Sequence, residues 1–343
     1  METAVYGAGA MGTVLGAFLS GAGLRPDLIS RNRDHVEALR KNGARITGGA
    51  ALTVPVSALL PEEMEKRYDL IILLTKQLDN RASAERLIPF LAPGGTVLTL
   101  QNGIPEPGLA GVLGEDRVMG GIAVWGAGLA GPGAAELTSA RESMRFGIGV
   151  PWKGPAAEVL KPRLPEIKAL LERVCPVTIE ENFMGLRWSK LLVNAAFSGL
   201  SALTGWTFGR VAGDRRGREL ALRIIGECVA VCRAAGETIA PVRGGLRAEA
   251  FFSGPLARFA AGFVLPLAVR KHARIRSGMI ADLDRGRRTE VDAINGVVCD
   301  WGLKYGAAAP VNRRVVELVH ALERGERSRG PENLDLLRRE VRR

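Results

Sequence analysis

Histidine, cysteine and aromatic residues are all scarce in this chain of 343 residues. It has three histidines and four cysteines, and no two cysteines form a Cys-x-x-Cys pair. Because this spacing assembles no local zinc site, we expect no metal centre. The cysteines are expected to be reduced thiols of a cytoplasmic protein, and they are Cys175, Cys228, Cys232 and Cys299.

Long hydrophobic runs are missing as well. Residues 1–24 are largely apolar, but they carry Glu2 and repeated glycines and lack the basic start of a signal peptide. Residues 255–269 are too short to span a bilayer and are interrupted by Arg258. The sequence therefore predicts no membrane segment.

The formal net charge of +11 is unevenly distributed. Residues 1–183 contain 19 Lys and Arg against 20 Asp and Glu, whereas residues 184–343 contain 28 against 16. A basic half is one mark of a nucleic-acid binder. However, these arginines are scattered among acidic residues, and an aromatic content of 5% is too low for stacking platforms. We expect no nucleic-acid partner, because attraction of anionic substrate and cofactor phosphates, or simply a soluble basic surface, accounts for the charge.

Apolar strand patterns and helical patterns alternate up to about residue 101. Strands are expected at 3–6, 28–30, 68–75 and 96–101, and helices at 10–20, 34–41 and 82–91. The run YDLIILLT at 68–75 is continuously apolar, as in a parallel strand that is covered on both faces. This alternation predicts an α/β fold with an N-terminal doubly wound sheet of the Rossmann type.

The pattern changes after Gly120. Short alternating segments between glycine and proline turns predict antiparallel strands that complete the sheet, followed by a helix at 156–173 and a strand at 177–179. From Met184 to about Leu322 the sequence is helical. The expected parts are a Rossmann domain over 1–183, a C-terminal all-helical domain over 184–325, and a charged tail over 326–343 that is either frayed or a short helix.

A glycine-rich motif follows the first expected strand and opens the first helix. It matches G-x-G-x-x-G, in which the first glycine allows a tight turn, the second lets the backbone approach a pyrophosphate, and the third allows close helix packing. The helix N-terminus then offers free N–H groups to the phosphates. A glycine turn without a ligand is the alternative, but the flanking elements favour a dinucleotide site formed by Gly7, Ala8, Gly9, Ala10, Met11 and Gly12.

The end of the second strand indicates which dinucleotide binds. NAD sites usually place Asp or Glu here to hold the ribose 2′-hydroxyl. In this chain the strand ends at Ser30 and is followed by Arg31 and Arg33. A guanidinium group can bind a 2′-phosphate, so we predict NADP(H) with Arg31 as a ligand. The alternative is that both arginines are merely solvated.

A dehydrogenase that reduces a ketone needs a group that donates a proton to the developing alkoxide or stabilises it. The three histidines (His35, His272 and His320) lie in charged helical stretches away from any motif, which leaves lysine as the candidate. Lys190 interrupts the apolar helix LRWSKLLVN, and Asn194 lies one turn later on the same face. A half-buried ammonium group has a lowered pKa and can act as an acid near neutrality. A surface lysine that extends its charge into solvent is the alternative.

The chain resembles the ketopantoate reductase family over most of its length. Five motifs in the family's order carry this resemblance. They are the glycine turn at 7–12, Lys76 in LLTKQ, Asn102-Gly103 in LQNG, Lys190 with Asn194, and TEVDAING at 289–296, which contains Glu290.

The resemblance implies roles for these residues. Lys190 would be the general acid at the substrate carbonyl, and Glu290 would orient substrate or cofactor near the nicotinamide. Lys76 would contact the cofactor, and Gly126 lies where the family's backbone passes the nicotinamide. Asn102 would form hydrogen bonds to substrate and cofactor. Glu290 also follows a run of arginines and could equally pair with them, namely Arg285, Arg287 and Arg288.

The resemblance also implies that Asn194 and residue 198, eight residues after Lys190, contact substrate. At position 198 the chain departs from the family's pattern. The family usually has Asn at the latter position, where this chain has Ser198. Where the family commonly has two serines, this chain has Ser277-Gly278, and the loop near Phe208 lacks an expected polar residue. Residues 241–271 also carry extra helical sequence. These departures put the substrate in doubt more than the reaction type.

The resemblance thus implies an oxidoreductase acting on CH–OH groups, which passes hydride from NADPH to the keto carbon of a 2-oxo acid. The expected substrate is 2-dehydropantoate, which is reduced to pantoate for pantothenate and coenzyme A biosynthesis. The alternatives are a paralogue that reduces another 2-oxo acid, an opine-type dehydrogenase, and an NADP-sensing protein without turnover. Assembly as a homodimer is also open.

Overall fold

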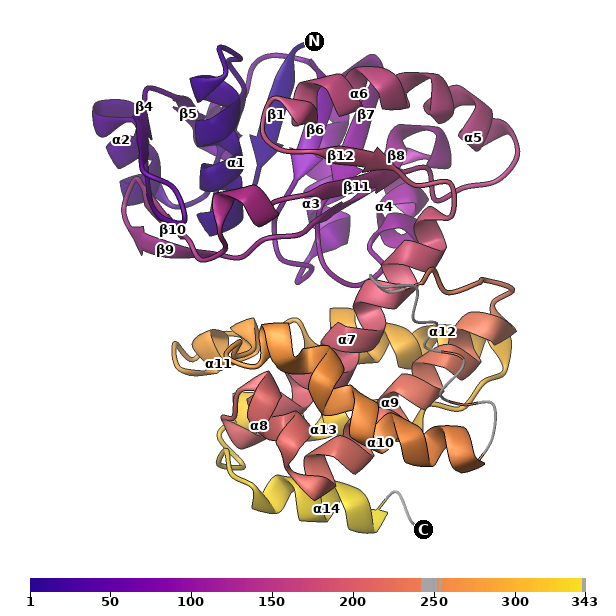
Figure 1. Cartoon of the computed structure of the whole chain (residues 1–343). Coiled ribbons are helices and arrows are strands. Elements are labelled where there is room, and N and C mark those ends of the chain that lie inside the picture. Colours follow the sequence, from indigo (N-terminus) through magenta and orange to yellow (C-terminus); the bar gives the residue numbers. More distant parts are fainter. Residues whose placement is uncertain (242–248, 250–251, 253–254, 341–343) are drawn as a thin grey trace. The chain divides into compact units, whose positions relative to one another are not determined.

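The computed structural model describes residues 1–241, 249, 252 and 255–340. The chain divides into two compact units. The first, called the α/β unit, comprises Met1–Gln101 and Pro105–Phe183. The second, called the helical unit, comprises Asn102–Ile104 and Met184–Arg343. Figure 1 shows the strands gathered in the first unit and the long helices in the second.

The α/β unit is built on an eight-stranded sheet in the order β12-β11-β8-β7-β6-β1-β2-β5 (Figure 1). Its strands are β1 (Thr3–Tyr6), β2 (Asp27–Ile29), β5 (Ser57–Leu59), β6 (Tyr68–Leu73), β7 (Leu91–Thr99), β8 (Val118–Ala123), β11 (Phe146–Gly149) and β12 (Val177–Ile179). Neighbours pair in parallel except β8 with β11. The chain crosses from β2 on one side of β1 to β6 on the other. The carboxyl ends of β1 and β6 therefore flank the switch point at which such sheets bind ligands.

Helices cover both faces of this sheet. They are α1 (Ala10–Gly21), α2 (Arg33–Asn42), α3 (Asn80–Leu87), α4 (Glu106–Leu113), α5 (Pro155–Leu160) and α6 (Leu164–Glu172). Apolar side chains of α3 and α4 pack on one face, and those of α1 and α6 belong to the cluster on the other. Double coverage explains why β6 is apolar at nearly every position, with Asp69 near its start as the charged exception. The single helix expected at 156–173 is interrupted by a 3₁₀ turn at Lys161–Arg163, next to the prolines of KPRLP.

A second sheet was not expected from the sequence. It has the order β4-β3-β10-β9 and consists of β3 (Ala44–Gly48), β4 (Leu52–Val54), β9 (Ala127–Gly131) and β10 (Ala134–Leu137). The segments after Gly120 were predicted to complete the main sheet, which is wrong for β9 and β10. β10 pairs in parallel with β3 because its alternate residues Ala135 and Leu137 are buried with Ile46 in the cluster that contains α1. Among these later segments, β11 does join the main sheet in antiparallel pairing with β8.

The helical unit is organised around one long helix. Its helices are α7 (Phe183–Thr204), α8 (Phe208–Gly213), α9 (Arg215–Ala234), α10 (Pro255–Val269), α11 (Gly278–Leu283), α12 (Val297–Tyr305), α13 (Pro310–Glu323) and α14 (Glu332–Glu340), with a π-helical turn at Asp292–Gly296. Buried residues all along α7 share one core with α9, α12 and α13. No helix in the described part of the chain combines the length and apolarity needed to cross a bilayer.

The C-terminal segment is part of this unit. Leu334 and Leu337 of α14 are fully buried in its core. The side chain of Asn333 donates a hydrogen bond to the carbonyl of Leu203 at the end of α7, at 3.0 Å. Of the two alternatives expected for residues 326–343, the short helix is observed, over Glu332–Glu340, because a narrow apolar stripe in a charged sequence is enough to dock a helix. Part of the 241–271 segment, residues 242–248, 250–251 and 253–254, lies outside the described residues.

Candidate functional site

The glycine turn lies between β1 and α1, and its three glycines meet different surroundings. Gly7 has a φ of +104°, and a Cβ there would lie 2.5 Å from the backbone nitrogen of Thr75. A Cβ on Gly12 would lie 2.5 Å from the carbonyl oxygen of Gly7, whereas a Cβ on Gly9 would meet nothing within 4 Å. The chain's own packing therefore requires Gly7 and Gly12. Gly9 leaves open space beside the turn.

The start of α1 suits the pyrophosphate of a dinucleotide. Within the described residues, no side chain caps this end at Gly9, and the first turn contains no acidic residue. The helix therefore presents its positive end without an internal anion to compensate it. Together with the open space at Gly9, this arrangement fits a phosphate group.

Other predicted residues of the α/β unit follow strand ends at the same edge of the sheet. Arg31 follows β2, Lys76 follows β6 and Gly126 follows β8. These strands all run parallel to β1. Their carboxyl ends therefore share the edge at which the glycine turn lies. Gly126 donates its N–H to the hydroxyl of Ser139 at 2.9 Å, which anchors this position in the turn between the two sheets.

Arg31 and Arg33 differ in their surroundings. Arg33 pairs with Glu62 at 3.4 Å, whereas Arg31 is exposed and pairs with no acidic residue of the described chain. Burial raises the pKa of Tyr6 at the end of β1, and the charges of Arg86 and then Arg31 act against this rise. Both guanidinium groups therefore act on the carboxyl end of β1. Arg86 could not be singled out from the sequence, because an exposed arginine in a helix gives no local signal.

A buried glutamine fixes the loops that follow β6 and β7. The Nε2 of Gln101 donates to the carbonyl of Thr75 at 2.9 Å and to Oδ1 of Asn80 at 2.8 Å, and its Oε1 accepts from the hydroxyl of Thr99 at 3.0 Å. These bonds fix the backbone of Thr75, the residue that precedes Lys76. Gln101 was not among the predicted site residues, although its place in the LQNG motif was an available signal.

Lys190 lies on α7 in the helical unit and is partly buried. Burial lowers the pKa of its ammonium group from 10.5 to about 8, and the charge of Arg187 acts in the same direction. The charge of Glu290 opposes this shift, so the structure brings Lys190 and Glu290 within electrostatic reach of each other. Arg187 lies one turn before Lys190 and is 1% exposed. Arg187 was not among the predicted site residues, although it also interrupts an apolar helix.

Glu290 lies just before the π-helical turn, which is tied to α7 by a buried amide. Asn295 is fully buried and donates through Nδ2 to the carbonyl of Ala195 at 3.0 Å and to Oδ1 of Asn312 at 2.9 Å. Glu227 accepts the backbone and side-chain N–H groups of Asn312 at 3.0 and 2.7 Å. This polar chain joins α7, the π-helical turn, α13 and α9. It gives the segment after Glu290 a defined position relative to Lys190's helix.

Two positions at which the chain departs from the family pattern, Ser198 and Gly278, come together with Asn194 in the helical unit. Asn194 and Ser198 lie four residues apart on α7, and both are half-buried. The N–H of Ser277 donates to the hydroxyl of Ser201 at 3.2 Å, and Ser201 lies one turn beyond Ser198. Gly278, the first residue of α11, is therefore held beside the same stretch of α7.

Asn102 and Phe208 complete the set of predicted positions. Asn102 belongs to the helical unit together with Ile104, which is buried in that unit's core. Phe208 is 6% exposed and packs on Phe197, with ring centroids 5.5 Å apart. Phe208 itself is therefore a core residue of this unit.

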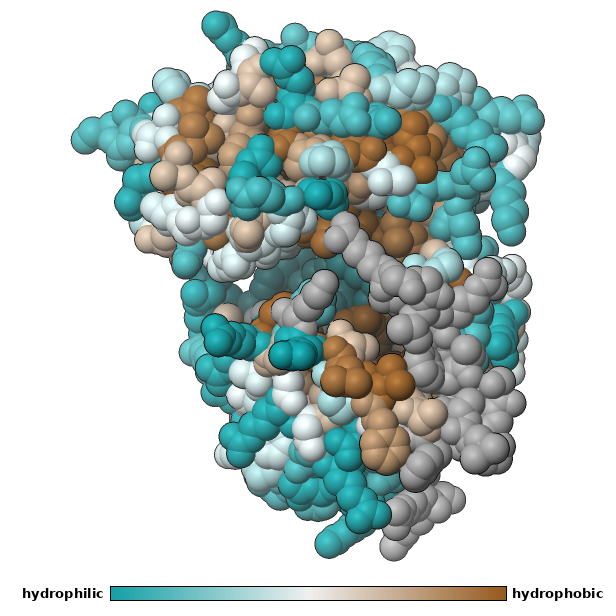
Figure 2. Space-filling view, in the orientation of Figure 1, coloured by the Kyte–Doolittle hydropathy of each residue, from teal (hydrophilic) through white to brown (hydrophobic). Residues whose placement is uncertain are grey.

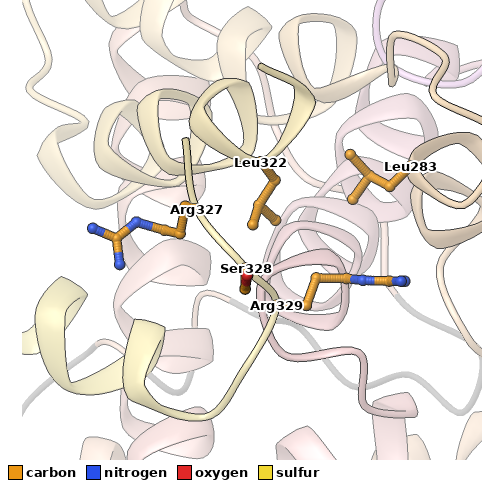
Figure 3. Close-up of a pocket in the computed structure, with 5 residues that line it drawn as sticks. All are labelled: Leu283, Leu322, Arg327, Ser328 and Arg329. Atoms are coloured by element: carbon orange, nitrogen blue, oxygen red, sulfur yellow. The ribbon is translucent and has the colours of Figure 1, made fainter. Parts of the chain in front are cut away.

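A surface hollow of about 350 Å³ in the helical unit lies among residues that the sequence did not implicate. Its lining consists of Leu283, Leu322, Arg327, Ser328 and Arg329 (Figure 3). The two arginines point in opposite directions (Figure 3), and they bind Asn333 at 3.1 Å and Asp284 at 2.6 Å. Both guanidinium groups are thus bound by other residues, and nothing in the described lining of this hollow indicates a ligand site.

Two family models together match most of the chain. The model described as ketopantoate reductase PanE/ApbA matches residues 3–150, and the model described as its C-terminal part matches residues 182–323. A 2-dehydropantoate 2-reductase of Streptococcus pyogenes serotype M6 is 30% identical over 329 residues, with 93% of this chain and 97% of the relative covered.

Solved structures show the same fold. A PanE/ApbA family ketopantoate reductase from Ralstonia eutropha JMP134 matches with a TM-score of 0.78 and 26% identity, covering 95% of this chain and 99% of that one. A D-mandelate dehydrogenase with NADH and anilino(oxo)acetate matches with a TM-score of 0.79 and 24% identity over the same shares. The latter likeness shows the fold alone.

Proposed function

The chain belongs to the ketopantoate reductase family of oxidoreductases, and from this we propose that it reduces 2-dehydropantoate to pantoate with NADPH. The observation that carries the proposal is the partly buried Lys190, whose pKa is lowered to about 8 and which interacts with Glu290. Such a lysine is an acid of suitable strength near neutral pH. The test is to follow NADPH absorbance with a panel of 2-oxo acids that includes 2-dehydropantoate.

In the proposed mechanism each unit has its own task. The helical unit supplies the proton: the Nζ of Lys190 donates it to the ketone oxygen, so that no free alkoxide accumulates. Arg187 and burial make this ammonium group more acidic than an ordinary lysine, and Glu290 limits that effect and orients the reactants. Asn194 and Asn102 offer amide groups that can hydrogen-bond the substrate.

The α/β unit holds the dinucleotide in this proposal. Gly9 and the positive end of α1 take the pyrophosphate, and Lys76 and Gly126 lie at the same sheet edge for the rest of the cofactor. When bound, NADPH supplies the hydride that reduces the keto carbon. The protein supplies placement and charge.

Cofactor choice provides a first prediction. We expect NADPH to bind at least tenfold more tightly than NADH, which corresponds to about 1.4 kcal/mol, because Arg31 is unpaired and can hold the 2′-phosphate. Fluorescence titration with both cofactors measures this. Arg31→Ala should remove the preference with little change in NADH affinity. Arg33→Ala is the matched control and should preserve the preference, because Arg33 already pairs with Glu62. Equal affinities in the unaltered protein would contradict the assignment.

A second candidate function is favoured by the altered substrate contacts. A reductase for another 2-oxo acid, or an opine-type dehydrogenase, would keep Lys190 and change the groups that bind the rest of the substrate. Ser198 is shorter than the usual Asn and lacks its amide, and Gly278 lacks a hydroxyl. A site that loses hydrogen-bonding groups discriminates less strongly for a substrate hydroxyl.

These two positions give a second prediction. We expect weak reduction of 2-dehydropantoate, and Ser198→Asn with Gly278→Ser should raise kcat/KM for it more than for 2-oxo acids without a 4-hydroxyl. A Cβ on Gly278 would meet nothing within 4 Å, so the serine fits without strain. Steady-state kinetics over the substrate panel measure the change. Efficient turnover by the unaltered protein would show that other residues compensate, and no turnover at all would make the second candidate the leading one.

Three further expectations stay predictions. A non-catalytic NADP sensor would be expected to have lost Lys190 or Glu290, and both are present.

A homodimer would have apolar surface to cover: Figure 2 shows apolar side chains around α10, of which Phe263 and Leu267 are 66% and 69% exposed. The cytoplasmic location expected from the sequence is compatible with four free cysteines.

A further inference from the structure

His320 on α13 lies between two carboxylates. Its Nδ1 is 2.8 Å from Oε2 of Glu323, and its Nε2 is 2.9 Å from Oδ1 of Asp292. Ionised carboxylates only accept hydrogen bonds, so the ring can donate to both of them at once only as an imidazolium, with a proton on each nitrogen. The sequence places this histidine in a charged helical stretch away from any motif, whereas in the structure its ring contacts Asp292 of the 289–296 motif.

The two carboxylates are connected to the backbone on either side of Glu290. Oε1 of Glu323 accepts the backbone N–H of Thr289 at 2.7 Å, and Asp292 lies two residues after Glu290. Thr289 is 2% exposed and Val291 is fully buried, so the backbone on either side of Glu290 has little freedom. One protonated ring therefore links α13 to the short segment that presents Glu290.

We propose that His320 is a positioning residue for the reaction: by bridging Asp292 and Glu323 in its protonated form, it fixes Glu290 beside Lys190. This inference rests on the role of Glu290 in the proposed function. This role requires no contact of His320 with substrate or cofactor. It acts through the segment 289–292.

The bridge has a definite pH dependence. Partial burial acts to lower the pKa of His320, but the hydrogen bonds to Glu323 and Asp292 outweigh it and raise the pKa above 6.5. A raised pKa in the folded state means that the bridge is complete below pH 6.5 and is lost as the pH rises through the folded value. Above that value one ring nitrogen no longer donates, and one carboxylate loses its partner.

Other charged groups face the bridge from the surrounding elements. Arg288 lies 3.8 Å from Asp292, and the charge of Asp292 also acts on Asp300 of α12. Arg324, which binds Glu326, acts on Glu323 from the end of α13. The arginines partly neutralise the two carboxylates, but neither replaces the link that the ring makes between them.

A double-mutant cycle tests the coupling to Glu290. His320→Gln should lower kcat by about tenfold to 10²-fold at saturating NADPH, because a small misplacement of a reacting group has an effect of this size. In a Glu290→Gln background the same change should have no further effect on kcat. NADPH affinity should change little, since the groups proposed to hold the pyrophosphate and the 2′-phosphate belong to the α/β unit. His272→Gln, at an exposed histidine, is the matched control and should leave kcat unchanged.

The cycle separates the two claims. If Glu290→Gln lowers kcat but His320→Gln lowers it equally in both backgrounds, or not at all, the positioning role is wrong and the proposed function stands. If Glu290→Gln leaves kcat unchanged, the role given to Glu290 is wrong, and the positioning role falls with it.

NMR titration of the unaltered protein tests the bridge even if a variant fails to fold. The chain has three histidines, so their ring signals can be assigned one by one. The His320 ring should titrate above pH 6.5, and Asp292→Asn should lower that value. A ring that titrates at or below pH 6.5 would overturn the protonated bridge.

Discussion

Lys190→Ala is expected to lower kcat by about 10² to 10⁴ while NADPH affinity barely changes. Loss of a general acid usually has an effect of this size. Lys190 lies in the helical unit, whereas the glycine turn, Arg31 and Lys76 belong to the α/β unit, so cofactor binding and proton donation can be separated by mutation. Stopped-flow measurement of a single turnover, together with a fluorescence titration of NADPH, measures both quantities.

The pH profile of the unaltered protein gives a second measure of the same assignment. An acid must be protonated to act, and the lowered pKa of about 8 means that Lys190 carries its proton below that pH. The rate of ketone reduction should therefore fall as the pH rises through about 8 rather than through 10.5. Glu290→Gln should move this fall to lower pH, because the negative charge of Glu290 favours the ammonium form.

Lys304→Ala provides the matched control for Lys190→Ala. Lys304 is an exposed lysine of the same unit, on α12, and its replacement should leave kcat and the pH profile unchanged. A Lys190→Ala protein that keeps most of its kcat would make Lys190 an ordinary half-buried lysine. The proposed proton donor would then have to be another group.

Gly9→Ala is expected to weaken NADPH binding by about tenfold to 10²-fold without lowering the unfolding midpoint. A Cβ at this position meets no protein atom within 4 Å, and the φ of −80° is open to alanine, so the free protein should fold normally. The methyl group instead occupies the space through which the backbone would approach the pyrophosphate. Overpacking of this kind costs about 1–3 kcal/mol, which gives the expected range.

Gly12→Ala is the matched comparison, because its cost should appear in the protein without cofactor. Its Cβ would lie 2.5 Å from the carbonyl oxygen of Gly7, so α1 must shift and the unfolding midpoint should fall. Thermal unfolding with and without NADPH distinguishes the two variants. If Gly9→Ala binds NADPH as well as the unaltered protein, the open space beside the turn is not the pyrophosphate site.

Local sequence was a good guide wherever one segment decides its own structure. The helix expected at 10–20 is observed as Ala10–Gly21, and the strand expected at 3–6 is observed as Thr3–Tyr6. The residues that determine where these elements begin and end are glycines and apolar residues that lie close to each boundary in the sequence. The continuous apolar run at 68–75 likewise indicated a strand covered on both faces, observed as Tyr68–Leu73.

The pairing of strands that lie far apart in the chain could not be predicted from local sequence. β10 follows β3 by more than eighty residues, and short strands of mixed burial do not show which sheet they join. The same limit applies to α14, where Leu334 and Leu337 are two apolar residues in a charged segment. Burial against α7 and α9 is what makes the segment part of the core.

Short motifs with fixed spacing were enough to predict the doubly wound sheet, the family, the glycine turn as a candidate site, and the candidate pair Lys190 and Glu290. The surroundings of these residues, in contrast, depend on how the chain packs in three dimensions. This packing lowers the pKa of Lys190 through burial and Arg187, and it places His320 between Asp292 and Glu323. Electrostatic interactions depend on distance and solvent exposure, and both are set by packing between segments that lie far apart in the chain.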